Sequence, residues 1–399
     1  MKNNINSSLS LYLFIILFFS IFFLFFKSQT GNDSTIAEWL INYEGGFTKR
    51  GIVGQISITI SRIFDLDLRF TILIFQILSC SVFYYCIFKF FKSHQYDRFS
   101  LLALFSPIFI LYPVAEIEVL ARKEMLVFIL YFLYLFLPKY SSFKSLSLCI
   151  YFILAILIWE PIIFYTPVFI AIEIIDRKIE KINFDLLKIF SFFVPGIILG
   201  FFMAINPMSD ESYNIMKNVL QNDFGENCYG ACSLLNSKST ILQQFEDNIP
   251  YYSLEILLRY FLIIIIGFGP LFILLKNSKF KNTKLIFFNL FDNLLLPILI
   301  CLIPVIVLFA MGYDWGRWVN ITYFFTLVFY FYFEKQNLLI KKKDIKKNII
   351  FKLTKKTFIF IFIIFCFSWN PKTVMTGDVG SFPIYRVPYK AVKIFNNNF

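Results

Sequence analysis

Histidine and metal-binding cysteine motifs are nearly absent from this chain. Its 399 residues include one histidine, and none of the seven cysteines forms a C-x-x-C motif. Because a structural zinc site needs about four closely spaced ligands of these types, the composition argues against one. Charged residues are also scarce, at 16% of the chain, whereas soluble domains contain about a quarter. A large soluble domain is therefore not expected.

Apolar and aromatic residues dominate instead. They make up 58% and 21% of the chain, and phenylalanine alone contributes 55 residues. The formal net charge is +12, but the basic residues lie in short segments between apolar runs, which is the pattern of a membrane protein. We therefore expect an all-α integral membrane protein, in a bacterial inner membrane, with membrane lipids and not nucleic acid as its partners.

The apolar runs predict the membrane spans. A span needs about 20 apolar residues, or fewer when it is short and flanked by aromatics. The first run lacks a cleavage site and is interpreted as an uncleaved helix. The long run 146–175 is interrupted by Trp159-Glu160-Pro161, which predicts a hairpin of two short helices turning at Glu160. The prediction is about eleven spans, at 9–26, 69–91, 99–113, 124–137, 146–158, 161–175, 187–205, 255–275, 287–311, 318–333 and 357–369.

Lysine and arginine asymmetry orients these spans. The basic run 335–356 is the strongest cytoplasmic marker, and segments 176–188 and 276–284 agree with it, so the N-terminus is predicted to be cytoplasmic. The whole chain, 1–399, then forms one membrane domain. Its outer segments are predicted at 27–68, 114–123, 206–254 and 312–317, with the tail 370–399 also outside.

Two cysteines lie in the outer segment 206–254. Cys228 and Cys232 would face an oxidising compartment, where a small-loop disulfide or two free thiols are both compatible with the sequence. The remaining five cysteines fall in predicted spans and are interpreted as packing residues.

The first outer segment carries the clearest local pattern, NYEGGFTKRGIVGQI at 42–56. Gly45, Gly46 and Gly51 permit tight turns and close approach of the backbone to a ligand. Lys49 and Arg50 are donors suited to phosphate, and the Glu44 carboxylate lies beside them. The stretches 34–43 and 51–64 are predicted to form interfacial helices. A solvated turn with a local ion pair is the alternative interpretation.

Further ionisable residues are predicted on the same side of the membrane. Ionisable groups next to hydrocarbon are costly to leave unpaired, so such clusters indicate functional sites. Simple ion pairs at helix ends, and an interfacial aromatic belt around Trp315, are the alternatives. If these residues meet in one pocket, its carboxylates and arginines suit chemistry on an anionic, phosphate-bearing substrate. They are Glu116, Arg122, Lys123, Glu160, Asp314 and Arg317, and the aromatic Trp315 flanks the last two.

This layout resembles the GT-C superfamily of membrane glycosyltransferases, which share many transmembrane helices and a long first outer loop with a functional acid. The resemblance implies a polyprenyl-phosphate-linked sugar donor. The loop acids here are Asp33, Glu38 and Glu44, without the adjacent acidic pair that is frequent in that family, and no large C-terminal soluble domain follows.

The resemblance also implies roles for individual residues. Glu44 is predicted to activate the acceptor hydroxyl, with Asp314 or Glu116 as second choices. The remaining candidates would bind the donor, and a divalent metal cofactor is left open. These substrate-binding candidates are Lys49, Arg50, Arg122, Lys123, Glu160, Trp315 and Arg317.

Three other interpretations remain. The chain also resembles O-antigen polymerase-like proteins, in which Arg50, Arg122 and Arg317 would be the functional arginines. A transporter or flippase of lipid-linked glycans needs a polar path through the membrane, for which Asp292 is the main candidate. A non-catalytic scaffold is the third.

Overall fold

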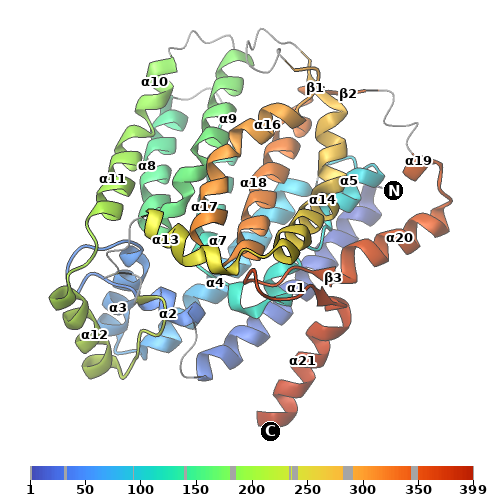
Figure 1. Ribbon diagram of the computed structural model, residues 1–399. Helices are drawn as coiled ribbons and strands as arrows, with labels where there is room; N and C mark the ends of the chain where they lie inside the picture. Colours follow the sequence, from blue (N-terminus) through green and yellow to red (C-terminus); the bar gives the residue numbers. More distant parts are fainter. Residues whose placement is uncertain are drawn as a thin grey trace.

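The structure is a computed structural model that describes residues 2–30, 34–92, 94–138, 142–179, 186–232, 235, 241–281, 291–342 and 349–398. Within these ranges the chain is almost entirely helical, and the exceptions are two antiparallel two-stranded sheets (Figure 1). The prediction of an all-α fold is therefore confirmed at the level of fold class.

Three helices are long and apolar enough to cross a membrane. They are α1 (Lys2–Gln29), of which Asn6–Gln29 is apolar, α4 (Leu68–Phe91) and α14 (Leu254–Lys276). Their apolar stretches of 23 or 24 residues span about 35 Å at 1.5 Å per residue, slightly more than the bilayer core. The described ranges thus contain three helices that are both long and apolar enough to cross a membrane, fewer than the eleven predicted spans.

The other helices in the predicted spans are shorter or more polar. Together with the three long helices they form a bundle (Figure 1). They are α5 (Arg98–Leu104), α7 (Glu124–Phe136), α8 (Ser142–Ile158), α9 (Thr166–Ile179), α10 (Leu186–Ser191), α11 (Val194–Ile205), α16 (Leu295–Cys301), α17 (Ile306–Met311), α18 (Trp315–Lys335) and α20 (Lys355–Phe367).

Prolines break three of the predicted spans. In 99–113, α5 ends at Leu104 and turns around Pro107 lead to the short α6 (Tyr112–Ala115). In 187–205, α10 and α11 are separated just before Pro195. In 287–311, residues 287–290 lie outside the described residues, and η5 (Ile303–Val305) separates α16 from α17. Proline lacks the amide donor and clashes with the preceding turn, so an apolar run that contains it does not continue as one helix.

Helix α18 is the centre of the bundle. Every residue from Trp315 to Phe333 except Thr322 is buried. A helix that is buried on all sides has to be covered by neighbours all round, and α9, α14 and α17 are among those that pack against it. The N-terminal end of α18 carries two ionisable residues of the site described below, Asp314 and Arg317.

The two ends of the bundle differ in structure. At one end lie α2 (Ser34–Leu40), α3 (Gly51–Phe64) and α12 (Asp210–Phe224) (Figure 1). At the other end, β1 (Ser278–Phe280) pairs with β2 (Leu339–Lys341) in an antiparallel register that places Ser278 opposite Lys341. The short α19 (Ile349–Lys352) precedes α20. Helices α2 and α3 occupy the two ranges predicted as interfacial helices.

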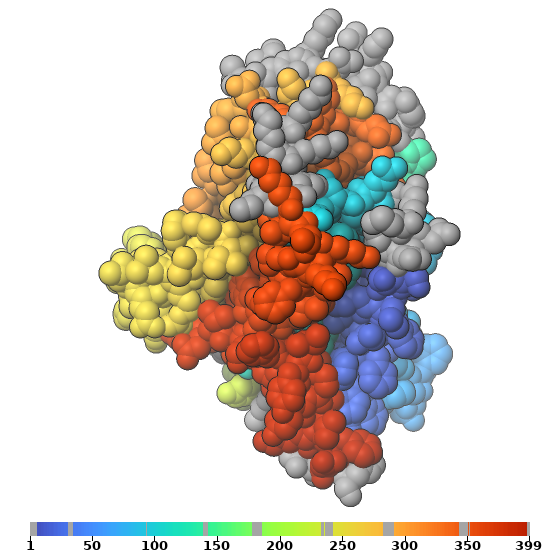
Figure 2. All heavy atoms as spheres, turned by 90° about the vertical axis from the view of Figure 1, so that its right-hand side faces the viewer, coloured from blue at the N-terminus to red at the C-terminus, as the bar shows by residue number. Residues whose placement is uncertain are grey.

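Helices and short strands occupy much of the described parts of two predicted outer segments, 206–254 and 370–399. The first contains α12, α13 (Ile241–Asn248) and η4 (Ile249–Tyr251). The second follows β3 (Trp369–Asn370), which pairs with β4 (Gly380–Ser381), and continues as α21 (Pro383–Asn398). Figure 2 shows this C-terminal segment lying beside the N-terminal helix on one face of the molecule.

Glycines allow the chain to pack closely on itself around α3. A Cβ atom at Gly45 would collide with the backbone carbonyl of Ser212 in α12, and one at Gly54 would collide with that of Ile41. The close approach predicted for this glycine-rich stretch is thus made to the protein's own backbone. It fixes α3 against the end of α2 and both against α12.

Candidate functional site

Six of the predicted site residues lie in one network of ion pairs and hydrogen bonds between the bundle and the end formed by α2 and α3. Glu38 in α2 and Glu124 at the start of α7 complete it. The network therefore contains four cations and four carboxylates contributed by five separate parts of the chain. The six predicted members are Arg50, Arg122, Lys123, Glu160, Asp314 and Arg317.

Arg50 forms the first half of the network. Its guanidinium group donates to both carboxylate oxygens of Glu160, with Nε to Oε2 at 2.7 Å and Nη2 to Oε1 at 2.8 Å. Nη1 also donates to Glu38 Oε1 at 3.3 Å. Glu160 begins η2 (Glu160–Tyr165), the turn between α8 and α9, as predicted for the hairpin. Burial raises the pKa of Glu160, but the charge and hydrogen bonds of Arg50 and the charge of Lys49 bring it below its usual value.

Arg317 forms the second half. Its guanidinium donates to both oxygens of Glu124, at 2.6 Å each, and to Asp314 Oδ2 at 3.2 Å. The Arg317 side chain is also 5.3 Å from the centre of the Trp318 ring, within the range of a cation–π contact. Arg122 lies at the edge and contacts Asp314 Oδ2 at 3.4 Å. Asp314 thus joins two arginines at the partly exposed side of the network.

Glu38 connects the two halves. Its Oε1 atom contacts both Arg50, at 3.3 Å, and Arg317, at 3.5 Å. The residue is 2% exposed, and its other oxygen, Oε2, has no hydrogen-bond partner among the described residues. Burial raises the pKa of Glu38, but the surrounding cations, Arg317 most strongly and then Arg122, lower it to about 2. The carboxylate is therefore ionised and has one oxygen free to accept a hydrogen bond.

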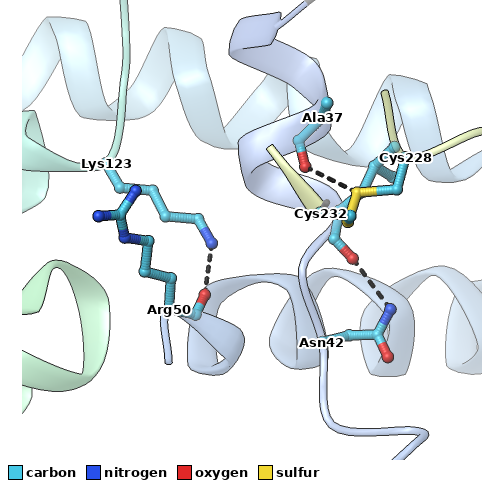
Figure 3. Close-up of a disulfide and its surroundings, with 7 residues drawn as sticks. Ala37, Asn42, Arg50, Lys123, Cys228 and Cys232 are labelled. Carbon is cyan, nitrogen blue, oxygen red and sulfur yellow. Dashed lines mark hydrogen bonds between the residues drawn. A yellow bond between two sulfur atoms is a disulfide. The ribbon is translucent and has the colours of Figure 1, made fainter. Parts of the chain in front are cut away.

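Lys123 lies beneath this network. It is fully buried, and its Nζ donates to the backbone carbonyl of Arg50 at 2.5 Å (Figure 3). Burial is the main cause that lowers its pKa to about 7, while Glu38 opposes the shift. Arg50 itself has a left-handed backbone with φ of 61°, and so does Ala121 with φ of 52°. Non-glycine residues rarely adopt this conformation, so Lys123 holds a strained turn in place.

The burial of the network changes from one side to the other. Glu38, Lys123, Glu124 and Arg317 are buried, whereas the Arg50, Arg122, Glu160 and Asp314 side chains are 12–26% exposed. A cavity of about 20 Å³, room for about one water molecule, has Arg122 and Glu124 in its wall. In this conformation the cavity is too small for a molecule larger than water. The network still reaches the protein surface through its partly exposed members, such as Arg50 and Asp314.

Four of the predicted residues lie outside the network. Glu44 accepts from Gln55 Nε2 at 2.9 Å and from Arg62 Nη1 at 3.0 Å, and Arg62 also pairs with Asp223. Glu44 therefore pairs with Arg62 near the C-terminal end of α3. It does not contact the arginines of the network, although the sequence had led us to expect this. Lys49 is half-buried and acts on Glu160 through its charge alone.

Glu116 and Trp315 have other partners as well. Glu116 Oε1 accepts from Asn370 at 3.0 Å, Lys372 at 3.1 Å and Arg386 at 3.0 Å, so it anchors the C-terminal segment. Trp315 is buried among aromatic rings and donates to the Phe309 carbonyl. Neither side chain faces the arginines, so the predicted convergence on one pocket is only partial.

A disulfide stabilises the neighbouring segment. Cys228 and Cys232 are bonded, with their Cα atoms 5.6 Å apart, and the Cys228 sulfur lies 3.4 Å from the Ala37 carbonyl of α2 (Figure 3). Cys232 packs in a small separate core that includes Ile41 and Met216. The disulfide therefore closes a short loop after α12, and this loop packs beside α2, the helix that carries Glu38.

Replacing both cysteines, Cys228→Ser with Cys232→Ser, is expected to destabilise this segment by about 2 kcal/mol, the loop-closure value for a ring of this size. Because the small core is separate from the bundle, the loss should be local. Hydrogen exchange of residues 210–232 should accelerate while exchange in α18 stays unchanged. Cys149→Ser, at a half-buried free thiol, is the matched control, and unaltered exchange after α12 would contradict the expectation.

The sequence did not single out several other buried charges. Lys144 donates to Asp176 Oδ2 at 2.6 Å, and Glu173 accepts from Tyr134 at 2.7 Å and from Arg177. The sequence signal for them is the presence of charges inside or next to apolar runs, a pattern that membrane topology also explains. Asp33, a predicted loop acid, lies outside the described residues, and Asp292 is exposed just before α16, which gives no support to a buried transport path.

Within the described ranges, no group of three His, Cys, Asp or Glu side chains is arranged to hold a metal ion, so no metal site is assigned. Comparison with known proteins provides no further identification: no family model matches the chain, and no match is found among curated proteins or solved structures.

Proposed function

We propose that the chain is a membrane glycosyltransferase that transfers a sugar from a polyprenyl-phosphate-linked donor to an acceptor at the outer face of the membrane. The observation that supports this most is Glu38, a buried, ionised carboxylate with one oxygen unpartnered among the described residues, between two guanidinium groups. In this proposal Glu38 accepts a proton, and the two neighbouring arginines donate hydrogen bonds to a phosphate. A likeness to the GT-C superfamily and to O-antigen polymerases is part of the same proposal.

The arginines would hold the donor phosphate. Arg50 and Arg317 each present two parallel N–H groups, which now bind the carboxylates of Glu160 and Glu124. The same fork fits phosphate oxygens. Because Arg50 and Glu160 are partly exposed, we propose that an arriving phosphate exchanges with the Glu160 carboxylate.

The transfer step follows from this geometry. Glu38 would accept the proton of the acceptor hydroxyl while that oxygen forms a bond to the anomeric carbon. The bond from the anomeric carbon to the donor phosphate oxygen breaks, and the phosphate leaves with the electron pair, stabilised by Arg50 and Arg317. A bound phosphate also counteracts the cations that lower the pKa of Glu38, so donor binding would make Glu38 a stronger base. We therefore place the base at Glu38 in preference to Glu44.

The membrane arrangement is part of the proposal. The three long helices support a membrane location, and we propose that the shorter apolar helices complete about eleven crossings of a bacterial inner membrane. The basic segments around 335–356 would then be cytoplasmic, and the ion network would lie at the outer side. The backbone polar groups at the ends of the shorter helices need hydrogen-bond partners inside a membrane, where water is absent. Packing of these helices against neighbouring helices of the bundle fits this requirement.

The purified chain in liposomes that contain polyprenyl-phosphate sugars should form a glycosidic bond. Glu38→Gln keeps the side-chain volume and is expected to lower the transfer rate by about 100-fold or more, because it removes the general base. Glu44→Gln, a carboxylate in the same loop outside the network, is the matched control and should retain most activity.

The outcomes separate the alternatives. Full activity of Glu38→Gln, with normal expression and unfolding, would contradict the assignment of the base, and loss of activity only in Glu44→Gln would return it to Glu44. Movement of the lipid-linked substrate across the bilayer without bond formation would instead indicate a transporter.

A further inference from the structure

Helix α21 has two apolar faces, and only one of them is used inside the protein. Val387 and Ala391 are buried, and the helix packs against α1 and α6. On a neighbouring face, Ile384, Tyr385 and Val392 are 54–67% exposed. Spacings of one, seven and eight residues place these side chains on one stripe of the helix. The exposed stripe is therefore a continuous feature of α21 and not a set of scattered residues.

Tyrosines and cations border this stripe. Tyr389 is 54% exposed and stacks on Tyr385, with ring centres 5.6 Å apart. Lys390 and Lys393 follow on the side turned away from the stripe, and Arg386 lies on the same side. An apolar stripe with tyrosines and a basic border is the pattern of a helix that lies in a membrane interface, with its cations among lipid phosphates.

The helix that packs against α21 also exposes large apolar side chains. Helix α1, which is long and apolar enough to cross a membrane, exposes Phe14, Phe18 and Phe25. Helix α21 packs against α1, and Figure 2 shows the C-terminal segment beside the N-terminal helix on one face of the molecule. At 16 residues, α21 is about 24 Å long and too short and polar to cross the bilayer itself.

The tether of α21 is polar and specific. Arg386 Nη2 donates to Glu116 Oε1 at 3.0 Å, to the Asn370 side chain at 2.7 Å and to the Ala115 carbonyl at 3.2 Å. These bonds fix the start of the helix to the bundle while the exposed stripe points away from it. The hydrogen bonds of this tether involve Arg386 and neither Lys390 nor Lys393. Both lysines can therefore bind lipid phosphates.

We propose that α21 is a lipid-binding helix beside α1, at the end of the bundle where α2, α3 and α12 lie (Figure 1). Ile384, Tyr385 and Val392 enter the boundary between headgroups and acyl chains, and Lys390 and Lys393 bind anionic lipid headgroups. This interaction does not depend on the proposed glycosyl transfer. It assigns Glu116, through Arg386, the role of fixing a membrane-bound helix.

Site-specific fluorescence on the full chain tests this proposal. An environment-sensitive probe is attached at Val392→Cys or, as the matched control, at the adjacent Lys393→Cys, in a Cys149→Ala background. Nanodiscs contain phosphatidylethanolamine with phosphatidylglycerol, or phosphatidylcholine alone. The probe at 392 should show blue-shifted emission and about twofold or stronger quenching by lipids that carry a shallow quencher, relative to the probe at 393. Lys390→Glu with Lys393→Glu should reduce the quenching at 392 in anionic nanodiscs but not in phosphatidylcholine alone.

Two results would overturn the proposal. Water-like emission and equal quenching at both positions would show that the stripe faces solvent. A blue-shifted probe at 392 that lipid quenchers do not reach, but that cross-links to another copy of the chain, would show that α21 covers a second protomer and not lipid.

Discussion

Replacement of Arg317 by alanine is expected to lower the free energy of unfolding by about 3–5 kcal/mol, the range for removing one partner of a buried ion pair. The side chain is 4% exposed and binds both oxygens of Glu124 at 2.6 Å. Its removal leaves Glu124 without the guanidinium group that binds both of its oxygens. Glu38 also loses one of the two arginines that contact its carboxylate. Unfolding in mixed detergent micelles, followed by the reactivity of the buried thiols of Cys80 and Cys366, measures the loss.

Two further variants isolate the cause. Arg317→Lys keeps the charge, but one ammonium group cannot reproduce the two parallel hydrogen bonds, so an intermediate loss is expected. Arg317→Met combined with Glu124→Met removes both charges and should be less destabilising than Arg317→Ala, because no carboxylate is left unpaired at that position. A loss below about 0.5 kcal/mol for Arg317→Ala, typical of a surface substitution, would show that the pair is not buried as described.

Local patterns predicted the helices at the site well. The stretch predicted as an interfacial helix at 51–64 is α3, Gly51–Phe64, and the turn at Glu160 lies between α8 and α9. Both follow from short-range causes: an amphipathic repeat after a glycine in the first case, and a proline that ends a helix in the second. The break in 99–113 was missed because its overall hydropathy concealed the effect of Pro107.

The limits of the prediction for the site have a different cause. Charge asymmetry sorts residues between two ends of a bundle, but it does not fix their positions within that layer. Arg122, Glu160 and Arg317 meet because α7, α9 and α18 pack together, whereas Glu44 is drawn to Arg62 at the far end of α3 and Glu116 to the C-terminal segment. Those pairings depend on long-range contacts, which a single sequence does not reveal. Glu38 became central only through its position between two arginines.

The stability of the protein is expected to rise with pH above 7 because of Lys123. Burial lowers the pKa of Lys123 from 10.5 to about 7 in the folded protein. Between these values the unfolded chain binds a proton at this residue that the folded chain lacks, so raising the pH favours folding. The gain is complete above pH 10.5 and is lost as the pH falls to 7. Its slope approaches about 1.4 kcal/mol per pH unit.

Lys123→Met removes the titrating group, so the difference in unfolding free energy between wild type and variant should change with pH across 7–9. At pH 7 the variant gains from the absence of a buried cation but loses the hydrogen bond to the Arg50 carbonyl, whose left-handed turn then lacks its support. At pH 9 the wild type loses less stability through the proton that Lys123 gives up on folding, while the variant still lacks the hydrogen bond, so Lys123→Met should compare progressively worse with wild type as the pH rises. Lys92→Met, at an exposed position on the end of α4, controls for the removal of a lysine. If the unfolding free energies of wild type and Lys123→Met change in parallel with pH, Lys123 keeps its proton in the folded protein. The four nearby carboxylates would then outweigh the cost of burying the charge.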